Sequence, residues 1–172
     1  MSRTSEAYGQ AMRGAPEESE WEEPSDRELF RVLMPYDPGP ASSNPGRGRH
    51  WGDENRLRVA AHEIAATYWK LAGSDTAPGP VRVVWVVYRA RQLDADNLLR
   101  GLKGVRDALF GRRRVEIKIG GRRCYLTEPG RITPDDTPDH IRGERVVQRI
   151  APKWAGNAWT DVCVIDAREE QP

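Results

Sequence analysis

The stretch Val81–Tyr88 (VRVVWVVY) limits the fold more than any other part of the chain. Every position except Arg82 is β-branched or aromatic, which is typical of a strand covered on both faces. We therefore expect this strand to be central in a sheet. Its apolar run is far shorter than the roughly 18 residues that a membrane span requires, so we expect no membrane association.

Apolar residues at helical spacing on either side of this strand predict two main helices. The first runs from Asp53 to Leu71 and the second follows Asn97 and ends at Leu109. Gly120-Gly121 between two short alternating segments predicts a β-hairpin. The expected fold class is α/β of the α+β kind, a single domain with a mixed sheet, two flanking helices and an Arg-rich hairpin insertion. The other predicted strands are Glu28–Met34, Val115–Ile119, Arg122–Thr127, Arg145–Ile150 and Thr160–Ile165.

The formal net charge of +1 is distributed unevenly. Residues 1–26 carry seven acids and two arginines, which is −5, so residues 27–172 carry +6. The first segment lacks hydrophobic periodicity, so we interpret it as a disordered acidic tail and residues 27–168 as the folded domain. Two cysteines exclude a disulfide framework and offer no zinc site of the usual spacing. Without an apolar signal core, we expect a cytoplasmic protein.

The junction between the central strand and the second helix (RQLDADN, residues 91–97) carries two closely spaced acids. In an extended chain Asp94 and Asp96 point to the same side and can bind one hard cation. The simpler alternative is that Asp96 caps the helix and Asp94 is a solvated loop residue.

A second acid cluster lies at Thr133–His140 (TPDDTPDH). Taken alone, it is explained by a proline-containing turn whose aspartates bond their own backbone. Taken with Asp94 and Asp96, it suggests three carboxylates whose repulsion is offset by a divalent cation. Magnesium held by a few carboxylates is the usual arrangement for phosphoryl chemistry.

A dense basic block lies close to these acids. Residues 100–123 contain nine lysines and arginines against Asp107 and Glu116, a local charge of +7. Any one of these cations alone is explained as a solvated surface residue, but the block as a whole is typical of a polyanion-binding surface. The combination suggests a nuclease. The predicted DNA-binding residues are Arg47 and Arg49 in the loop before the first helix, and Arg100, Arg106, Arg112, Arg113, Arg114, Lys118, Arg122 and Arg123.

Asp94–Gly111 (DADNLLRGLKGVRDALFG), followed by Asp135-Asp136, resembles the RusA-type Holliday junction resolvases. That family carries D-x-D-N-L, K-x-x-x-D-A-L and later D-D motifs in the same order. The resemblance implies a homodimer that depends on Mg²⁺, with Mn²⁺ as the substitute, and that cuts four-way DNA junctions symmetrically. It also implies that Asp94, Asp96 and Asp136 hold the metal.

The chain departs from the pattern of the shorter family members, which we call the short pattern, at the position of the catalytic lysine. Arg100 stands four residues after Asp96, where the short pattern has lysine, and Lys103 stands seven after it. Lys103 keeps the family spacing to Asp107, so the resemblance assigns it the catalytic role, with Arg100 as the rival. The simple alternative for Lys103 is an i,i+4 ion pair with Asp107.

The long hairpin is a second departure, and it leaves Asp135 and Asp139 as alternatives to Asp136 for the third metal ligand. Two other functional classes also stay open. One is a non-catalytic DNA-binding or packaging accessory that uses the same basic surface. The other is a nucleotide-sugar transferase that uses its D-x-D as a metal and diphosphate site, although this chain is short for a second substrate lobe.

Overall fold

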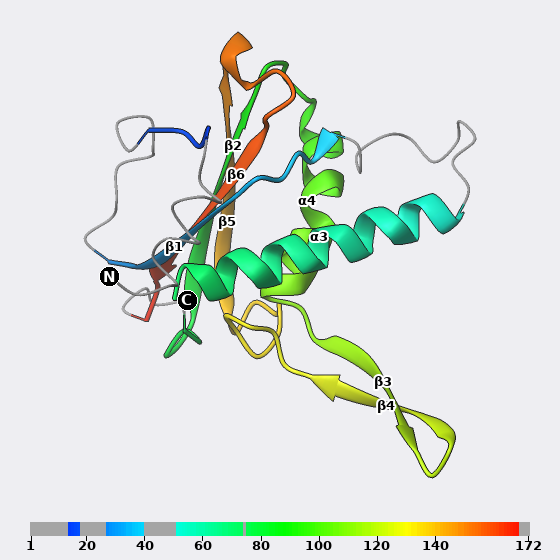
Figure 1. Cartoon of the computed structure of the whole chain (residues 1–172). Helices are drawn as coiled ribbons and strands as arrows, with labels where there is room; N and C mark the ends of the chain where they lie inside the picture. The colour runs from blue at the N-terminus through cyan, green and yellow to red at the C-terminus, as the bar shows by residue number, and fades with distance from the viewer. Residues whose placement is uncertain (1–13, 18–26, 40–50, 74, 169–172) are drawn as a thin grey trace, which may run out of the picture.

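The computed structural model describes residues 14–17, 27–39, 51–73 and 75–168 (Figure 1). Arg47, Arg49 and most of the predicted tail lie outside these residues. The elements of the main body are β1 (Glu28–Met34), α3 (Trp51–Leu71), β2 (Val81–Arg89), α4 (Ala95–Leu109), β5 (Ile141–Ile150), the short 3₁₀ turn η2 (Pro152–Trp154) and β6 (Trp159–Asp166). Between α4 and β5 the chain forms the hairpin β3 (Arg113–Ile119) and β4 (Arg122–Glu128).

The body is built on a mixed sheet in the order β1-β6-β2-β5. β2 pairs in parallel with β5 and antiparallel with β6, and seven of its nine residues are buried. This confirms the prediction that Val81–Tyr88 is a central strand. The predicted fold class is confirmed as well, since two main helices flank a mixed sheet and a separate hairpin follows the second helix.

Both helices pack on one face of this sheet (Figure 1). Leu98, Leu102 and Val105 of α4 are buried there, and the ring of Trp85 meets Phe110 edge to face at a centroid distance of 5.9 Å. A Cβ atom at Gly104 would come within 2.9 Å of the Ala61 methyl group. The absent side chain therefore lets α4 approach α3 closely.

The other face of the sheet has its own small core, against which Tyr68 of α3 also packs. Leu33, Val84, Tyr88 and Trp154 belong to this core. Ala15, from the segment predicted to be a disordered tail, packs against it, and Pro16 is buried. Residues 14–17 of the predicted tail therefore contact the body of the protein.

Four polar side chains lie close together on this face, between β1 and β6. Arg31 Nη2 donates to Glu28 Oε2 at 2.8 Å, and Arg31 Nη1 donates to Asp161 Oδ2 at 3.1 Å. The Cys163 thiol donates to Glu28 Oε2 at 3.0 Å. Asp161 is fully buried, and its Oδ1 has no hydrogen-bond partner within the described structure. One arginine thus serves two carboxylates, of which Asp161 is fully buried and Glu28 is partly exposed.

Asp161→Asn is expected to unfold at a higher temperature than the wild type at pH 8, with a clearly smaller difference at pH 5. Burial, with the nearby charge of Glu28 adding to it, raises the pKa of Asp161 to about 7 although Arg31 opposes the shift. A carboxyl whose pKa is raised by folding costs stability progressively as pH rises from its unfolded pKa to its folded pKa. Asparagine removes that cost. Thermal unfolding at both pH values measures it.

The matched control is Asp166→Asn on the same strand, because hydrogen bonds from Arg168 lower the pKa of Asp166. Its effect should have the opposite sign, with the variant less stable than the wild type at pH 8. An Asp161→Asn protein that is less stable than the wild type at pH 8 would show that the Arg31 ion pair outweighs burial.

Candidate metal and nucleic-acid site

Asp94 is the N-cap of α4. Its Oδ1 accepts a hydrogen bond from the Asn97 backbone N–H at 2.9 Å, and its Oδ2 accepts one from the Asn97 side-chain amide at 2.5 Å. The backbone hydrogen bond from Asn97 is the largest cause that lowers the pKa of this carboxyl, and the charge of Arg100 adds to it. Asp94 is thus an exposed and anionic group at physiological pH.

The helix begins earlier than the sequence indicated. Ala95 is already helical, so Asp96 lies in the first turn and not in an extended segment. The alternative that made Asp96 the cap is also wrong, because Asp94 has that role. Both carboxylates nevertheless project from one exposed helix start, where the positive end of the helix dipole favours negative charge.

Asp136 lies toward the other end of the same helix. It forms an ion pair of 2.5 Å with Arg106, and Arg106 Nε also donates to Glu144 at 3.0 Å. Arg106 follows Asp96 by ten residues, which is about 15 Å along an α-helix. The structure therefore does not bring Asp136 to Asp94 and Asp96 within one protomer. Among the described residues, no three His, Cys, Asp or Glu side chains form a group that could hold a metal.

Asp135 has a different environment from its neighbour. It is only 7% exposed, and its Oδ1 accepts a hydrogen bond of 2.6 Å from the Thr137 hydroxyl and lies 2.7 Å from His140 Nδ1. Arg112 donates to its Oδ2 at 2.8 Å. The hydrogen bond from Thr137, with those from His140 and Arg112, holds the pKa of Asp135 far below its usual range. Asp135 therefore fastens the loop, as the turn interpretation expects, whereas Asp136 and Asp139 face outward.

Lys103 is exposed, and its Nζ lies 3.3 Å from Asp107 Oδ2. This is the i,i+4 ion pair that was the simple alternative for Lys103. Such surface pairs contribute only a few tenths of a kcal/mol to stability. Lys103 can therefore leave Asp107 for a phosphate at little cost. We call the outer stripe of this helix the α4 face. It consists of the exposed residues Asp96, Leu99, Arg100 and Lys103 and the half-buried Asp107.

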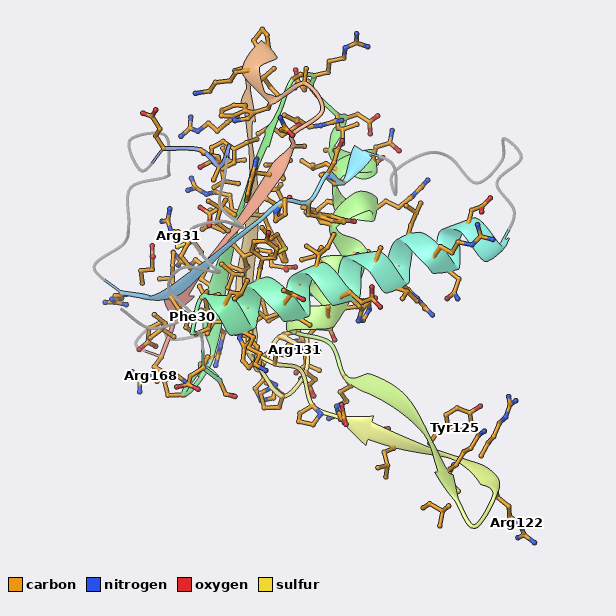
Figure 2. The ribbon with its side chains drawn as sticks, viewed as in Figure 1. Phe30, Arg31, Arg122, Tyr125, Arg131 and Arg168 are labelled. Carbon is orange, nitrogen blue, oxygen red and sulfur yellow. The ribbon has the colours of Figure 1, made fainter. Side chains whose placement is uncertain are left out.

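The basic residues fall into three groups. Arg100, Arg112, Lys118, Arg122 and Arg123 are exposed. Arg106 is already held by two carboxylates, so its charge is less available to DNA than the sequence indicated. The side chains of Arg113 and Arg114 lie outside the described part of the structure. Figure 2 shows Arg122 near the tip of the hairpin, far from the body.

The structure adds a cavity of about 880 Å³ between α3 and the loop that carries Asp136. Arg58, His62 and Glu63 of α3 line it, as does Arg131, which donates to the Ala108 carbonyl at 2.7 Å. Figure 2 shows Arg131 where the hairpin joins the body. Sequence reasoning missed these residues, since no local signal connects α3 with a loop some seventy residues later.

The residues at the start of α4 fit a magnesium ion. Mg²⁺ prefers carboxylate oxygens, and it commonly takes one or two from the protein while water and substrate phosphate supply the rest. Asp94 and Asp96 offer two such groups, both exposed. The oxygens of Asp94 already accept hydrogen bonds from Asn97, which orients the carboxylate and leaves further lone pairs free.

Comparison of the chain with protein-family models, with curated proteins and with solved structures finds no match in any of the three. No helix in the described ranges is long and apolar enough to cross a membrane.

Proposed function

We propose that the chain is a Mg²⁺-dependent, structure-selective endonuclease that resolves four-way DNA junctions in the manner of the RusA-type resolvases. The observation that carries this proposal is the exposed start of α4, where Asp94 and Asp96 stand at one end of a face that also bears Lys103. A hard-metal site beside a surface rich in exposed arginine suits phosphodiester chemistry. The proposal places the protein at DNA in the cytoplasm, associated with the nucleoid.

The chain's own residues have separable roles in this proposal. Bound Mg²⁺, or Mn²⁺ in its place, supplies charge stabilisation at the scissile phosphate and a more acidic water. Asp94 and Asp96 hold that cation. Lys103, released from Asp107, neutralises a non-bridging or leaving oxygen as its charge develops. Arg100 and the exposed hairpin arginines hold the DNA backbone.

The third ligand requires a second protomer in this scheme. Asp94 and Asp96 lie at the start of α4, and Asp136 lies beside Arg106 near its end. A two-fold axis that sets α4 antiparallel to α4 of a second copy, with the α4 face left open to DNA, brings the start of one helix near the end of the other, twice. Symmetric cutting needs two equivalent sites, and this homodimer would form both.

The decisive experiment incubates the full chain with a labelled four-way junction and with a duplex of the same sequence, each with and without Mg²⁺. We expect paired nicks at symmetric positions of the junction only with Mg²⁺, and little cutting of the duplex. Mn²⁺ should support the same cuts. Junction binding without any metal-dependent cutting would contradict the proposal.

Lys103→Ala is expected to lose most of the cleavage rate at saturating junction, whereas Arg100→Ala is expected mainly to weaken junction binding. A contact made chiefly in the transition state affects the rate, and a contact made equally before and during reaction affects affinity. Single-turnover rates and binding isotherms for the two variants separate these effects. The reverse pattern would transfer the catalytic role to Arg100.

The second candidate function is a non-catalytic DNA-binding or packaging accessory. One observation favours it: Asp136 is occupied by Arg106, and the three predicted ligands do not meet in the described protomer. This candidate predicts that Asp94→Asn and Asp96→Asn leave every activity of the protein unchanged. The nuclease predicts that both variants lose cleavage.

A further inference from the structure

The hairpin β3–β4, which we call the arm (residues 113–128), projects away from the body of the protein (Figure 1). Ile119 is 61% exposed and Leu126 is 52% exposed, although both are large and apolar. Figure 2 likewise shows Tyr125 well away from the sheet and the helices. An isolated two-stranded hairpin is marginally stable in water, so an arm of this kind needs a packing partner.

The strand register gives the arm two unlike sides. Ile119 pairs with Arg122, and Leu126 pairs with Val115, so alternation places Ile119 and Leu126 on the same side as Cys124. Lys118 pairs with Arg123 on the opposite side. One side therefore carries Ile119, Cys124 and Leu126, with Arg122 at the tip, and the other carries Lys118, Arg123 and Tyr125. We call them the apolar side and the basic side. The basic side suits DNA phosphates, whereas the apolar side suits a protein surface.

Two further large apolar residues are exposed toward the opposite end of α4. Leu99, near the start of α4, is 57% exposed, and Ile150, at the end of β5, is 45% exposed. The two residues belong to the same end of the body, because Ile150 pairs with Arg89 and Gln148 accepts a hydrogen bond from Leu93 N–H just before α4. We call Leu99 and Ile150 the end patch.

We propose that the apolar side of the arm docks on the end patch of a second copy of this chain. The arm leaves the body just after the end of α4, so the two-fold arrangement suggested above, on whose geometry this inference rests, directs it past the start of the partner's α4. The arm is about 23 Å long and α4 is about 22 Å long. An arm as long as the helix can reach the end patch of the partner. Each protomer would clasp the other.

Charge favours the same docking. The arm tip carries Lys118, Arg122 and Arg123, all exposed. The end patch lies beside Asp94 and Asp96, which are exposed at the start of α4. A basic tip close to two carboxylates is attracted in solution, and it would place arginines next to the metal site where a DNA phosphate must also bind.

The test measures self-association of the full chain by sedimentation velocity over a range of concentrations, without DNA or metal. The arm variant is Ile119→Ser with Leu126→Ser, and the end-patch variant is Leu99→Ser with Ile150→Ser. Each is expected to weaken the dimer by about tenfold or more, which is about 1.4 kcal/mol. The control is Lys118→Ala with Arg123→Ala on the basic side. It should weaken the dimer much less than the apolar changes do, because it removes only part of the charge attraction at the tip, and it should flatten the salt dependence of junction binding.

A wild-type chain that stays monomeric, or an arm variant that dimerises as the wild type does, overturns the proposal. An arm variant that dissociates while the end-patch variant stays dimeric also overturns it, because the arm then packs elsewhere. Melting temperatures of both variants at a fixed low concentration check that the bodies remain folded. Junction cleavage is assayed separately, so a clasped dimer that does not cut DNA would count against the nuclease and leave the docking in place.

Discussion

Asp94→Asn, Asp96→Asn and Asp136→Asn are each expected to lose at least about 100-fold in Mg²⁺-dependent cleavage, since changing even an outer-shell partner of a metal costs 10–100-fold. Junction binding should stay intact or tighten, because each change removes a negative charge that repels phosphate. Asparagine caps a helix as well as aspartate does, so Asp94→Asn should leave α4 stable. Single-turnover cleavage and metal-free binding assays measure the two properties.

Asp139→Asn is the matched control, since Asp139 is exposed on the same loop and the change in charge is identical. It should cut at nearly the wild-type rate. Asp135→Asn should act differently, by loosening the loop that Thr137, His140 and Arg112 fasten to this carboxylate. If Asp139→Asn loses cleavage and Asp136→Asn keeps it, Asp139 is the third ligand, and our assignment of Asp136 is contradicted.

The fold was largely predictable because its strands carry strong local signals. The β-branched run at Val81–Tyr88 could only be buried on both faces, and it is the interior strand β2. The turn at Gly120-Gly121 was equally clear, since both glycines have positive φ, 56° and 79°, as a tight hairpin turn requires. Pairing between distant strands was not predictable. Nothing local indicates that β5 lies parallel to β2.

The start of α4 shows why the site was predicted only in part. The sequence placed both acids in an extended segment, because apolar periodicity becomes visible only from Leu98. In the structure the segment is not extended. The Asp94 side chain accepts a hydrogen bond from the Asn97 backbone N–H, and the helix begins at Ala95. Helix capping and metal binding both explain an acid at the position of Asp94. Residue spacing alone cannot distinguish these two explanations.

Arg106 illustrates a second feature that the sequence pattern could not predict. As a cation in a basic block it was counted among the DNA-binding residues, yet its guanidinium bonds Asp136 and Glu144. These partners are 30 and 38 residues away in the chain. An ion pair between distant segments depends on tertiary packing, which the sequence pattern does not report. A metal ion or a phosphate that competes for either partner would have to separate this pair.

A mixture of two inactive proteins is expected to recover cleavage. One carries Asp94→Asn with Asp96→Asn, and the other carries Asp136→Asn. If each site takes its first two ligands from one protomer and its third from the partner, a mixed dimer contains one site with all three ligands changed and one intact site. After random exchange of subunits about half of the dimers are mixed. Each would nick one strand of the junction, so single nicks should outnumber paired cuts.

Sites built within one protomer would behave differently, because every site in a mixed dimer would then keep at least one changed ligand and no cleavage would return. The control mixes the Asp94→Asn, Asp96→Asn protein with one that carries Asp136→Asn and the arm changes Ile119→Ser and Leu126→Ser. Its recovery should be weaker if the arm holds the dimer together. Recovery without a mixed dimer detectable by native mass spectrometry would contradict the shared-site arrangement. In a shared site, each end of α4 would contribute to a different active centre. One helix could then hold Asp94 and Asp96 far from Asp136 of the same protomer although the proposed mechanism needs all three at one metal ion.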